Sequence, residues 1–243
     1  MPVDPSAPTV APSERSRIRR APKRASYDTD TIHSILDAAL VCHVAFVDDG
    51  QPFCIPTLHA RVGTEVFVHG ATSSRMIKTL SAGASACLTV TMLDGLVPAR
   101  SAFHHSMNYR SVVLLGAFRL IADEHAKLAA LRAFTEQLVP GRWADVRAPS
   151  AKELKATTVL ALSLDEASAK VRTGPPVDDE PDYERPTWAG VVPLRLERGT
   201  PQPDARVPSN VALPPYLAAR ANEISVTTEA ARSVSKPTWC DVQ

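Results

Sequence analysis

The spacing of apolar residues along the chain predicts short strands with a few helices between them. Residues 42–70 hold three short β-branched and aromatic runs separated by the polar segments DDGQ and VGTE, a pattern typical of an antiparallel meander. Residues 86–93, 109–121 and 157–166 predict further strands, and helical spacing occurs at 28–39, 72–83 and 123–139. Six or so hairpin-connected strands with flanking helices favour a mainly β fold, a closed or split antiparallel barrel, over a βαβ fold.

Several residues predict local features of these elements. Pro52 and Pro56 cannot donate ladder hydrogen bonds, so they belong at a strand start, an edge or a bulge. Thr72 or Ser73 is the expected N-cap of the short helix that follows. We expect Asp94–Gly95 to form a turn.

The later strands carry predictions of their own. Gly116 marks a bulge or a close approach within its strand. Residues 157–166 form the last clear strand, with Lys170 and Arg172 after it. Ser150 and Glu153 have the spacing of a capping box.

The ends of the chain differ in composition from its middle. Residues 1–26 are rich in Pro, Ser, Ala and Arg and nearly free of large apolar side chains, so we expect a disordered tail. The basic run Arg15–Arg24 is an arm for nucleic acid, a targeting fragment or a solvated tail, and the last is favoured. A barrel domain is predicted over residues 27–197, followed by a loosely ordered extension over 198–243.

Charge and cysteine content exclude several classes of partner. The chain has 27 basic and 26 acidic residues, a net charge of +1, so no field favours nucleic acid or a membrane surface. Its longest apolar runs are far shorter than a membrane helix needs. Four cysteines form no CxxC pair, and Cys42, Cys54 and Cys87 stand in apolar runs that predict burial. We expect a cytoplasmic protein.

One segment, HGATSSRMIK, has the chemistry of an anion site. Ser73, Ser74 and backbone N–H groups stand at a predicted helix N-terminus, with Arg75 in the first turn and Lys78 one turn further. The alternative is that Arg75 and Lys78 lie on a solvated helix face.

Other motif classes are missing from the sequence. His104 and His105 are neighbours, so on a strand they point to opposite faces and cannot bind one metal together. There is no GxGxxG after a strand, no P-loop, no GxSxG and no HExxH. We therefore predict no metal site and no dinucleotide-binding domain.

The order of five segments resembles the FMN-binding split barrel of the pyridoxamine 5'-phosphate oxidase-like family, especially its nitroimidazole-resistance branch. These segments are RASYD, HVAFVDDGQPFCIPT, VFVHGATSSRMIKTL, NYRSVVLLGAFRLI and TTVLALSLDEASAKVRTGPPVDDE, between about Arg24 and Leu194. The resemblance implies a homodimer with FMN in two clefts between the subunits. It implies that Ser73, Ser74, Arg75 and Lys78 hold the FMN phosphate, although that branch often has glycine and lysine where SSRM stands here.

The resemblance also suggests roles for residues on the predicted strands. His69 is placed near the flavin, where it would bind flavin or substrate or move a proton; the alternative is an ordinary strand-end histidine. Thr57 would flank the flavin ring. Tyr109 and Ser111 share one side of their strand and would contact the partner's flavin, Arg110 lying on the other side; the alternative is that they are barrel-wall residues.

Two functions remain in competition at this point. The first is an FMN-dependent oxidoreductase acting on a small organic substrate, in which the cofactor performs the redox step. The second is a non-catalytic flavin or haem binding protein. Oxidation of pyridoxamine phosphate itself is disfavoured, because the sequence lacks a full set of basic residues for the substrate phosphate.

Overall fold

The computed structural model describes residues 10–222. Along the chain these form two compact units, the first ending at Arg195 and the second beginning at Leu196. In the first unit the strands are β1 (Ala25–Ser26), β2 (Val41–Asp48), β3 (Gln51–Val62), β4 (Glu65–Ala71), β5 (Ser85–Val97), β6 (Ser106–Ala117), β7 (Arg119–Leu120), β8 (Thr157–Ser163), β9 (Ala167–Arg172) and β10 (Val192–Pro193). Its α-helices are α1 (Thr29–Ala38), α2 (Arg75–Ser81), α3 (Glu124–Leu138) and α4 (Ala151–Ala156). Short 3₁₀ turns are η1 (Pro22–Arg24), η2 (Ala102–His104), η3 (Arg142–Asp145) and η4 (Glu180–Glu184), and the second unit carries α5 (Pro215–Asn222).

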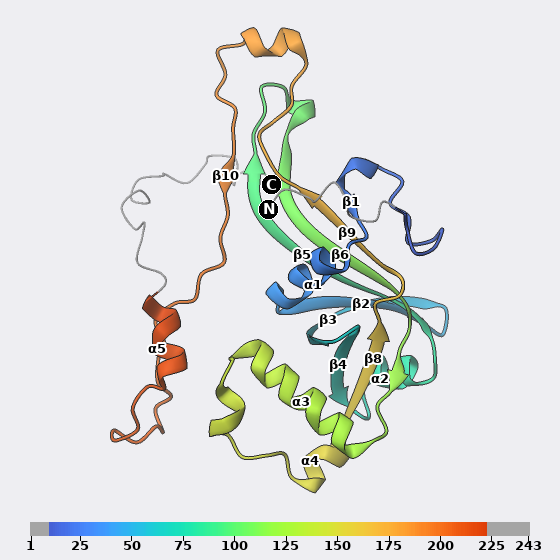
Figure 1. Ribbon diagram of the computed structural model, residues 1–243, viewed down its shortest axis with the longest axis vertical. Coiled ribbons are helices and arrows are strands. Elements are labelled where there is room, and N and C mark those ends of the chain that lie inside the picture. The colour runs from blue at the N-terminus through green and yellow to red at the C-terminus, as the bar shows by residue number, and fades with distance from the viewer. Residues whose placement is uncertain (1–9, 223–243) are drawn as a thin grey trace, which may run out of the picture. The chain divides into compact units, whose positions relative to one another are not determined.

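All strands pair antiparallel in one bent sheet, in the order β1-β9-β6-β5-β2-β3-β4-β8-β7, with β10 beside β5 (Figure 1). The bend lies in β3. Residues 51–58 of β3 pair with β2, whereas only residues 59–62 pair with β4. The sheet is therefore split along the first two thirds of β3, and the predicted mainly β split barrel with flanking helices is confirmed.

Apolar side chains pack on both faces of β4. Val66 and Val68 are fully buried in the barrel core with α1 and α2, a cluster that includes Leu36, Leu88 and Leu160. Phe67, at an alternate position, belongs to a second cluster that packs under α3 around Phe134. Helix α3 thus covers the outer face of β3, β4 and β8.

Local signals in the sequence set several element ends. Asp49 and Gly50 both have positive φ, at 48° and 75°, in the two-residue turn between β2 and β3, as a type I′ hairpin turn requires. Asp123 caps α3, and Ser150 forms the predicted capping box with Glu153. The cap of α2 is Ser74, not Thr72 or Ser73, because the Ser74 hydroxyl accepts from the Ile77 N–H.

Both strand prolines lie in residues 51–58 of β3, which have a single neighbouring strand, opposite Val47 and His43 of β2, so the edge prediction for Pro52 and Pro56 is confirmed. The predicted Asp94–Gly95 turn is wrong. Strand β5 continues through a bulge between Leu93 and Gly95 and turns only after Val97.

Two further predictions concern glycine and the strand after residue 166. The close approach at Gly116 is confirmed, since a Cβ there would lie 2.9 Å from Leu162 Cδ1. Residues 157–166 are not the last strand, because β9 follows and contains both Lys170 and Arg172. His104 and His105 do not lie on a strand either: His104 ends η2 and His105 follows it.

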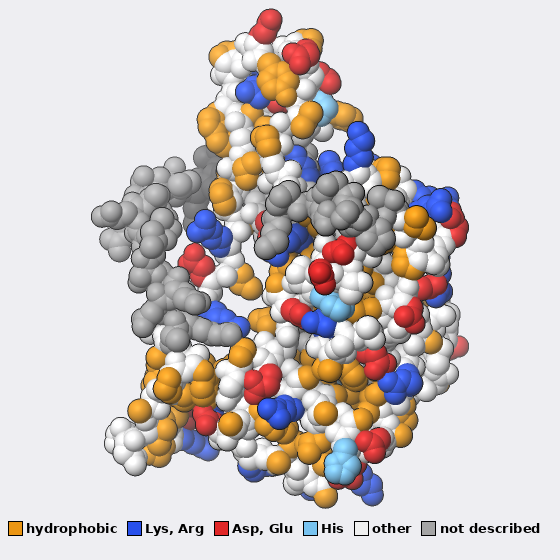
Figure 2. Space-filling model, in the orientation of Figure 1, with side chains coloured by type: hydrophobic (Ala, Val, Ile, Leu, Met, Phe, Trp, Pro, Cys, Tyr) orange, Lys and Arg blue, Asp and Glu red, His pale blue; other side chains and the backbone are white. Residues whose placement is uncertain are grey.

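Strands β5 and β6 extend beyond the rest of the sheet as a long hairpin, and residues 175–190 cross its tip (Figure 1). The Asp178 carboxylate ties the crossing segment down, accepting from the backbone N–H groups of Arg100 at 3.0 Å and Ser101 at 3.3 Å. Hydrophobic side chains gather on this projection (Figure 2) and include the exposed Leu96, Phe103, Met107, Tyr183 and Trp188.

The predicted N-terminal tail is shorter than residues 1–26. Ala25 and Ser26 pair with β9, Ser16 is buried, and the Ile18 N–H donates to Tyr27 Oη at 2.9 Å. Residues 1–9, and residues 223–243 of the predicted C-terminal extension, lie outside the described residues.

The three described cysteines differ in exposure. Cys42 is buried, and burial raises the pKa of its thiol to about 12. Cys87 is half-buried and Cys54 is exposed, so the predicted burial is wrong for Cys54, which lies in the part of β3 that has no β4 partner. Between residues 10 and 222 there is no helix long and apolar enough to span a membrane, and no cluster of three metal-ligating side chains.

Candidate functional site

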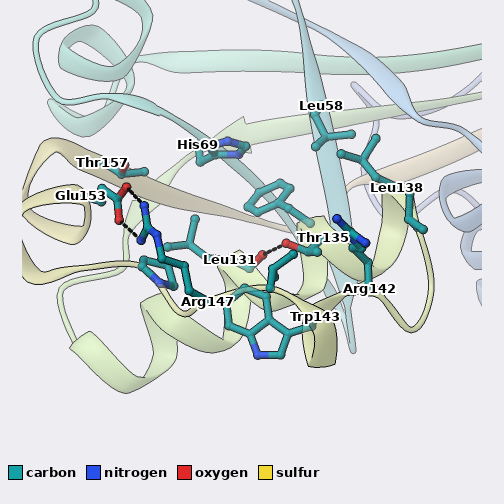
Figure 3. Close-up of a pocket in the computed structure, with 14 residues that line it drawn as sticks. Leu58, His69, Leu131, Thr135, Leu138, Arg142, Trp143, Arg147, Glu153 and Thr157 are labelled. Atoms are coloured by element: carbon teal, nitrogen blue, oxygen red, sulfur yellow. Dashed lines mark hydrogen bonds and ion pairs between the residues drawn. The ribbon is translucent and has the colours of Figure 1, made fainter. Parts of the chain in front are cut away.

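A cavity of about 590 Å³ lies between α3 and the sheet (Figure 3). The sheet contributes one residue from each of three strands, α3 contributes a row of apolar side chains, and the connection after α3 forms the opposite wall. The lining residues are Leu58, His69 and Thr157 from the strands; Leu131, Phe134, Thr135 and Leu138 from α3; Val139, Arg142, Trp143, Val146, Arg147 and Pro149 from the connection; and Glu153 from α4.

His69 places an imidazole among the apolar side chains of this cavity. Its ring packs at 4.3 Å, centroid to centroid, from the Phe134 ring. Its Nδ1 is buried and has no hydrogen-bond partner among the described residues. Burial lowers the pKa of His69 below its ordinary value of 6.5, so the imidazole is neutral at pH 7.

Two glutamates hold the wall formed by residues 139–149. The Glu136 carboxylate accepts from the backbone N–H groups of Gly141 at 2.6 Å and Trp143 at 3.0 Å, which fixes η3 and holds the Glu136 pKa below its usual range. At the other end, Glu153 pairs with both terminal nitrogens of Arg147, at 2.6 and 2.7 Å, and this pairing lowers the pKa of Glu153. The wall is therefore fastened to α3 and to α4.

Charge in this cavity is confined to its rim. Arg142 and Arg147 lie on either side of Trp143 (Figure 3), and Glu153 is neutralised by its pair with Arg147. The arrangement suits a flat, largely apolar ligand with an anionic edge, held against an imidazole.

A second candidate region borders the split in the sheet. Pairing of β3 with β4 stops at His59↔Val68, so residues 51–58 of β3 have no strand partner on that side, and this unpaired edge is here called the opening. Arg75 closes the far end, because its guanidinium lies 4.4 Å from the centre of the Phe53 ring. Arg75 Nε also lies 3.6 Å from Asp48 Oδ2.

Of the predicted phosphate-binding residues, which adjoin one another at the start of α2, Arg75 contacts β3 at this opening. Ser73, Arg75 and Lys78 are exposed, whereas the Ser74 hydroxyl already caps α2. Thr57 is half-buried on the facing strand. None of these five lines the His69 cavity.

Tyr109 and Ser111 are not brought to this opening within one chain. Both lie on β6, which is separated from β3 by β5 and β2. The Ser111 hydroxyl donates to the Lys170 carbonyl at 3.3 Å, and Arg110 pairs with Asp94 at 2.7 Å. A contact of Tyr109 or Ser111 with a partner's flavin stays a prediction.

Sequence reasoning missed most of the cavity. Trp143, Arg142 and Arg147 stand in GRWADVR, a segment without helix or strand periodicity. The signal available was a large aromatic residue between two arginines directly after a Pro-Gly helix stop.

Comparison with known proteins identifies the family of this chain. Residues 28–171 match the family model described as pyridoxamine 5'-phosphate oxidase, which is more than half of the chain. The chain belongs to the pyridoxamine 5'-phosphate oxidase family. The resemblance seen in the sequence is thereby confirmed.

Solved members similar to this chain include two that share most of its length. The flavocytochrome Anf3 from Azotobacter vinelandii is 46% identical, with a TM-score of 0.82 over 86% of this chain and 98% of that one. An FAD and haem binding protein from Mycobacterium smegmatis is 41% identical, with a TM-score of 0.78 over 81% of this chain and 97% of its own.

A more distant similarity shows the fold alone. A protein from Bacteroides thetaiotaomicron described as a 5-nitroimidazole antibiotic resistance protein is 22% identical, with a TM-score of 0.52 over 60% of this chain and 86% of that chain. No curated protein matches this chain.

Proposed function

We propose that this chain is an oxidoreductase that binds a flavin at the split between β3 and β4 and a haem in the His69 cavity. The observation that carries the proposal is the cavity itself, about 590 Å³, apolar, with one imidazole whose buried Nδ1 has no partner among the described residues. The flavocytochrome and the FAD and haem binding protein named above support the pair of cofactors.

The residues of the cavity fit a haem. Histidine is a common axial ligand of haem iron, and here His69 is the imidazole available to it. Leu58, Leu131 and Phe134 supply apolar surface for a porphyrin, and the exposed Arg147 stands where an ionised carboxylate would reach solvent. When bound, the two cofactors supply one- and two-electron chemistry; this chain binds them, orients them and excludes water.

The flavin assignment rests on the exposed basic turn and on membership of the family. The backbone N–H groups at the start of α2, with Arg75 and Lys78, would hold a flavin phosphate, and Thr57 would flank the ring. We retain FMN as the predicted flavin and place FAD beside it in the test, because the Mycobacterium protein is named for FAD.

We also propose that two copies of the chain associate. Val41, His43 and Val47 are exposed at alternate positions of β2, so the outer face of this part of the sheet lacks cover. In the pairing of β5 with β6, Tyr109 lies opposite Leu93 and Ser111 lies opposite Thr91. If a second copy packs on this face against the projecting β5–β6 hairpin, Tyr109 and Ser111 of one chain would contact the other chain.

An absorption spectrum of the purified protein tests the cofactor assignment. Flavin bands together with a haem Soret band are expected, followed by reduction by NAD(P)H coupled to an acceptor. His69→Ala should lose the Soret band or shift it strongly while flavin content stays within about twofold. His125→Ala, a change at an exposed histidine of α3, is the matched control and should alter neither band.

The outcome decides between the candidate functions. An unchanged Soret band in a folded His69→Ala protein would contradict haem ligation by this residue. A flavin that NAD(P)H and other donors fail to reduce would favour the non-catalytic binding protein.

A further inference from the structure

Arg147 lines the His69 cavity, and its two terminal nitrogens are hydrogen-bonded whereas its Nε is not. Its Nη1 and Nη2 donate to the two oxygens of Glu153, and Nη1 also donates to the Ala148 carbonyl at 3.2 Å. These bonds use the end of the guanidinium. The Nε–H makes no hydrogen bond to any described residue, so the side edge of the planar fork remains available to a second carboxylate.

Glu153 fixes the position of this fork. It is the third residue of α4, and its carboxylate accepts from the Ser150 N–H at 2.7 Å and the Ser150 hydroxyl at 2.9 Å. A side chain held this way by its own helix cap cannot swing with Arg147. The arginine is therefore preset at the rim, although 72% of its side chain is exposed.

The balance of charge around the cavity favours an anionic ligand edge. The fully charged residues that line it are two cations, Arg142 and Arg147, and one carboxylate, Glu153, and His69 is neutral. The remaining side chains are apolar or carry a hydroxyl.

We propose that Arg147, preset by Glu153 and assisted by Arg142, binds the carboxylate edge of the ligand in the His69 cavity, which for a haem means its propionates. This inference rests on the proposed haem function. It makes Arg147 a ligand-binding residue and Glu153 a positioning residue.

The test compares iron porphyrins that differ only at their carboxylates. Iron protoporphyrin IX and its dimethyl ester are titrated into the cofactor-depleted protein, and affinity is read from the Soret band. Arg147→Gln should weaken protoporphyrin binding by about 10- to 100-fold, as expected for a charge-assisted hydrogen bond. Binding of the dimethyl ester should change by less than about threefold, and the Soret position should not move, because His69 remains.

Two matched variants separate a ligand contact from a structural role. Arg119→Gln removes an arginine that is paired with Glu65 at 2.8 Å and lies outside the cavity, so both porphyrins should bind as before. Glu153→Gln keeps a capping side chain but loses the ion pair that presets Arg147, so protoporphyrin affinity should fall, by less than in Arg147→Gln, while the dimethyl ester binds as before.

Three results would overturn the inference. Equal losses for the acid and the ester in Arg147→Gln would mean that Arg147 only supports the wall. A loss of affinity for the dimethyl ester in Glu153→Gln as large as the loss for protoporphyrin would mean the same. Unchanged affinity in Arg147→Gln would refute the anchor while the haem function stood, whereas a wild-type protein that binds neither porphyrin would refute the haem function itself.

Discussion

Replacing Arg75 by Ala separates binding of the flavin phosphate from support of the fold. In the structure Arg75 is 60% exposed on its side chain, lies 3.6 Å from Asp48 and stacks on Phe53 at 4.4 Å. An exposed ion pair is worth about 0–1 kcal/mol, and an exposed cation–π contact about 0.5–1 kcal/mol. The variant should therefore lose at most about 1–2 kcal/mol of unfolding free energy and stay folded.

The loss in cofactor affinity should be larger and specific to the phosphate. A hydrogen bond to a charged group contributes about 1.5–3 kcal/mol, so the Kd for FMN should rise roughly 10- to 150-fold. Riboflavin lacks the phosphate, and its Kd should change by less than about threefold. Fluorescence titration of the flavin-free protein with FMN, FAD and riboflavin measures these values, with Arg132→Ala, at an exposed arginine of α3, as the matched control.

One result would refute this reasoning. If FMN and riboflavin lost affinity equally, Arg75 would act on the ring or on β3 through its stack on Phe53. In that case Phe53→Leu would reproduce the loss for both ligands, and the phosphate would have to bind elsewhere.

Three other predictions concern stability and assembly. His59 is fully buried, and burial holds its pKa below 6.5, so just below that pH the unfolded chain binds more protons than the folded chain. The free energy of unfolding should therefore fall on acidification, by at most about 1.4 kcal/mol per pH unit. An equally steep pH dependence in His59→Gln would contradict this. Gly116→Ala should cost about 1–3 kcal/mol in urea unfolding because its Cβ would meet Leu162, whereas Gly199→Ala meets nothing and should cost little. Sedimentation should show a dimer at micromolar concentration that Val47→Lys weakens; a flavin-loaded wild-type monomer would contradict it.

Much of the fold could be predicted because its signals are local. Asp28, Asp123 and Ser150 cap helices through contacts within three residues, and turns such as DDGQ specify their own geometry. Strand β9 was missed for the opposite reason. Its sequence ASAKVR alternates apolar and polar residues, but over only six residues and mostly with small alanines, a weak local signal; β6 and β1 supply its partners on both sides.

The two parts of the candidate site differ in the same way. The turn from Ser73 to Lys78 could be found in the sequence because a helix N-terminus with nearby cations is a local arrangement. The His69 cavity could not, because its lining comes from β3, β4, β8, α3, α4 and an irregular connection that meet only in the folded chain.

The direction of His69 shows why strand periodicity was not enough. On a half-buried strand, alternation tells which residues face the core, but Val66, Phe67 and Val68 are all buried and leave no polar face for comparison. By alternation from Val68, His69 lies on the same side of β4 as Phe67. The sequence does not tell which side of β4 is the barrel core, because that depends on where α3 packs, some 60 residues later in the sequence. Once α3 covers that side, the Phe134 ring packs against His69 at the cavity, and a histidine expected near the flavin becomes the candidate ligand of a second cofactor.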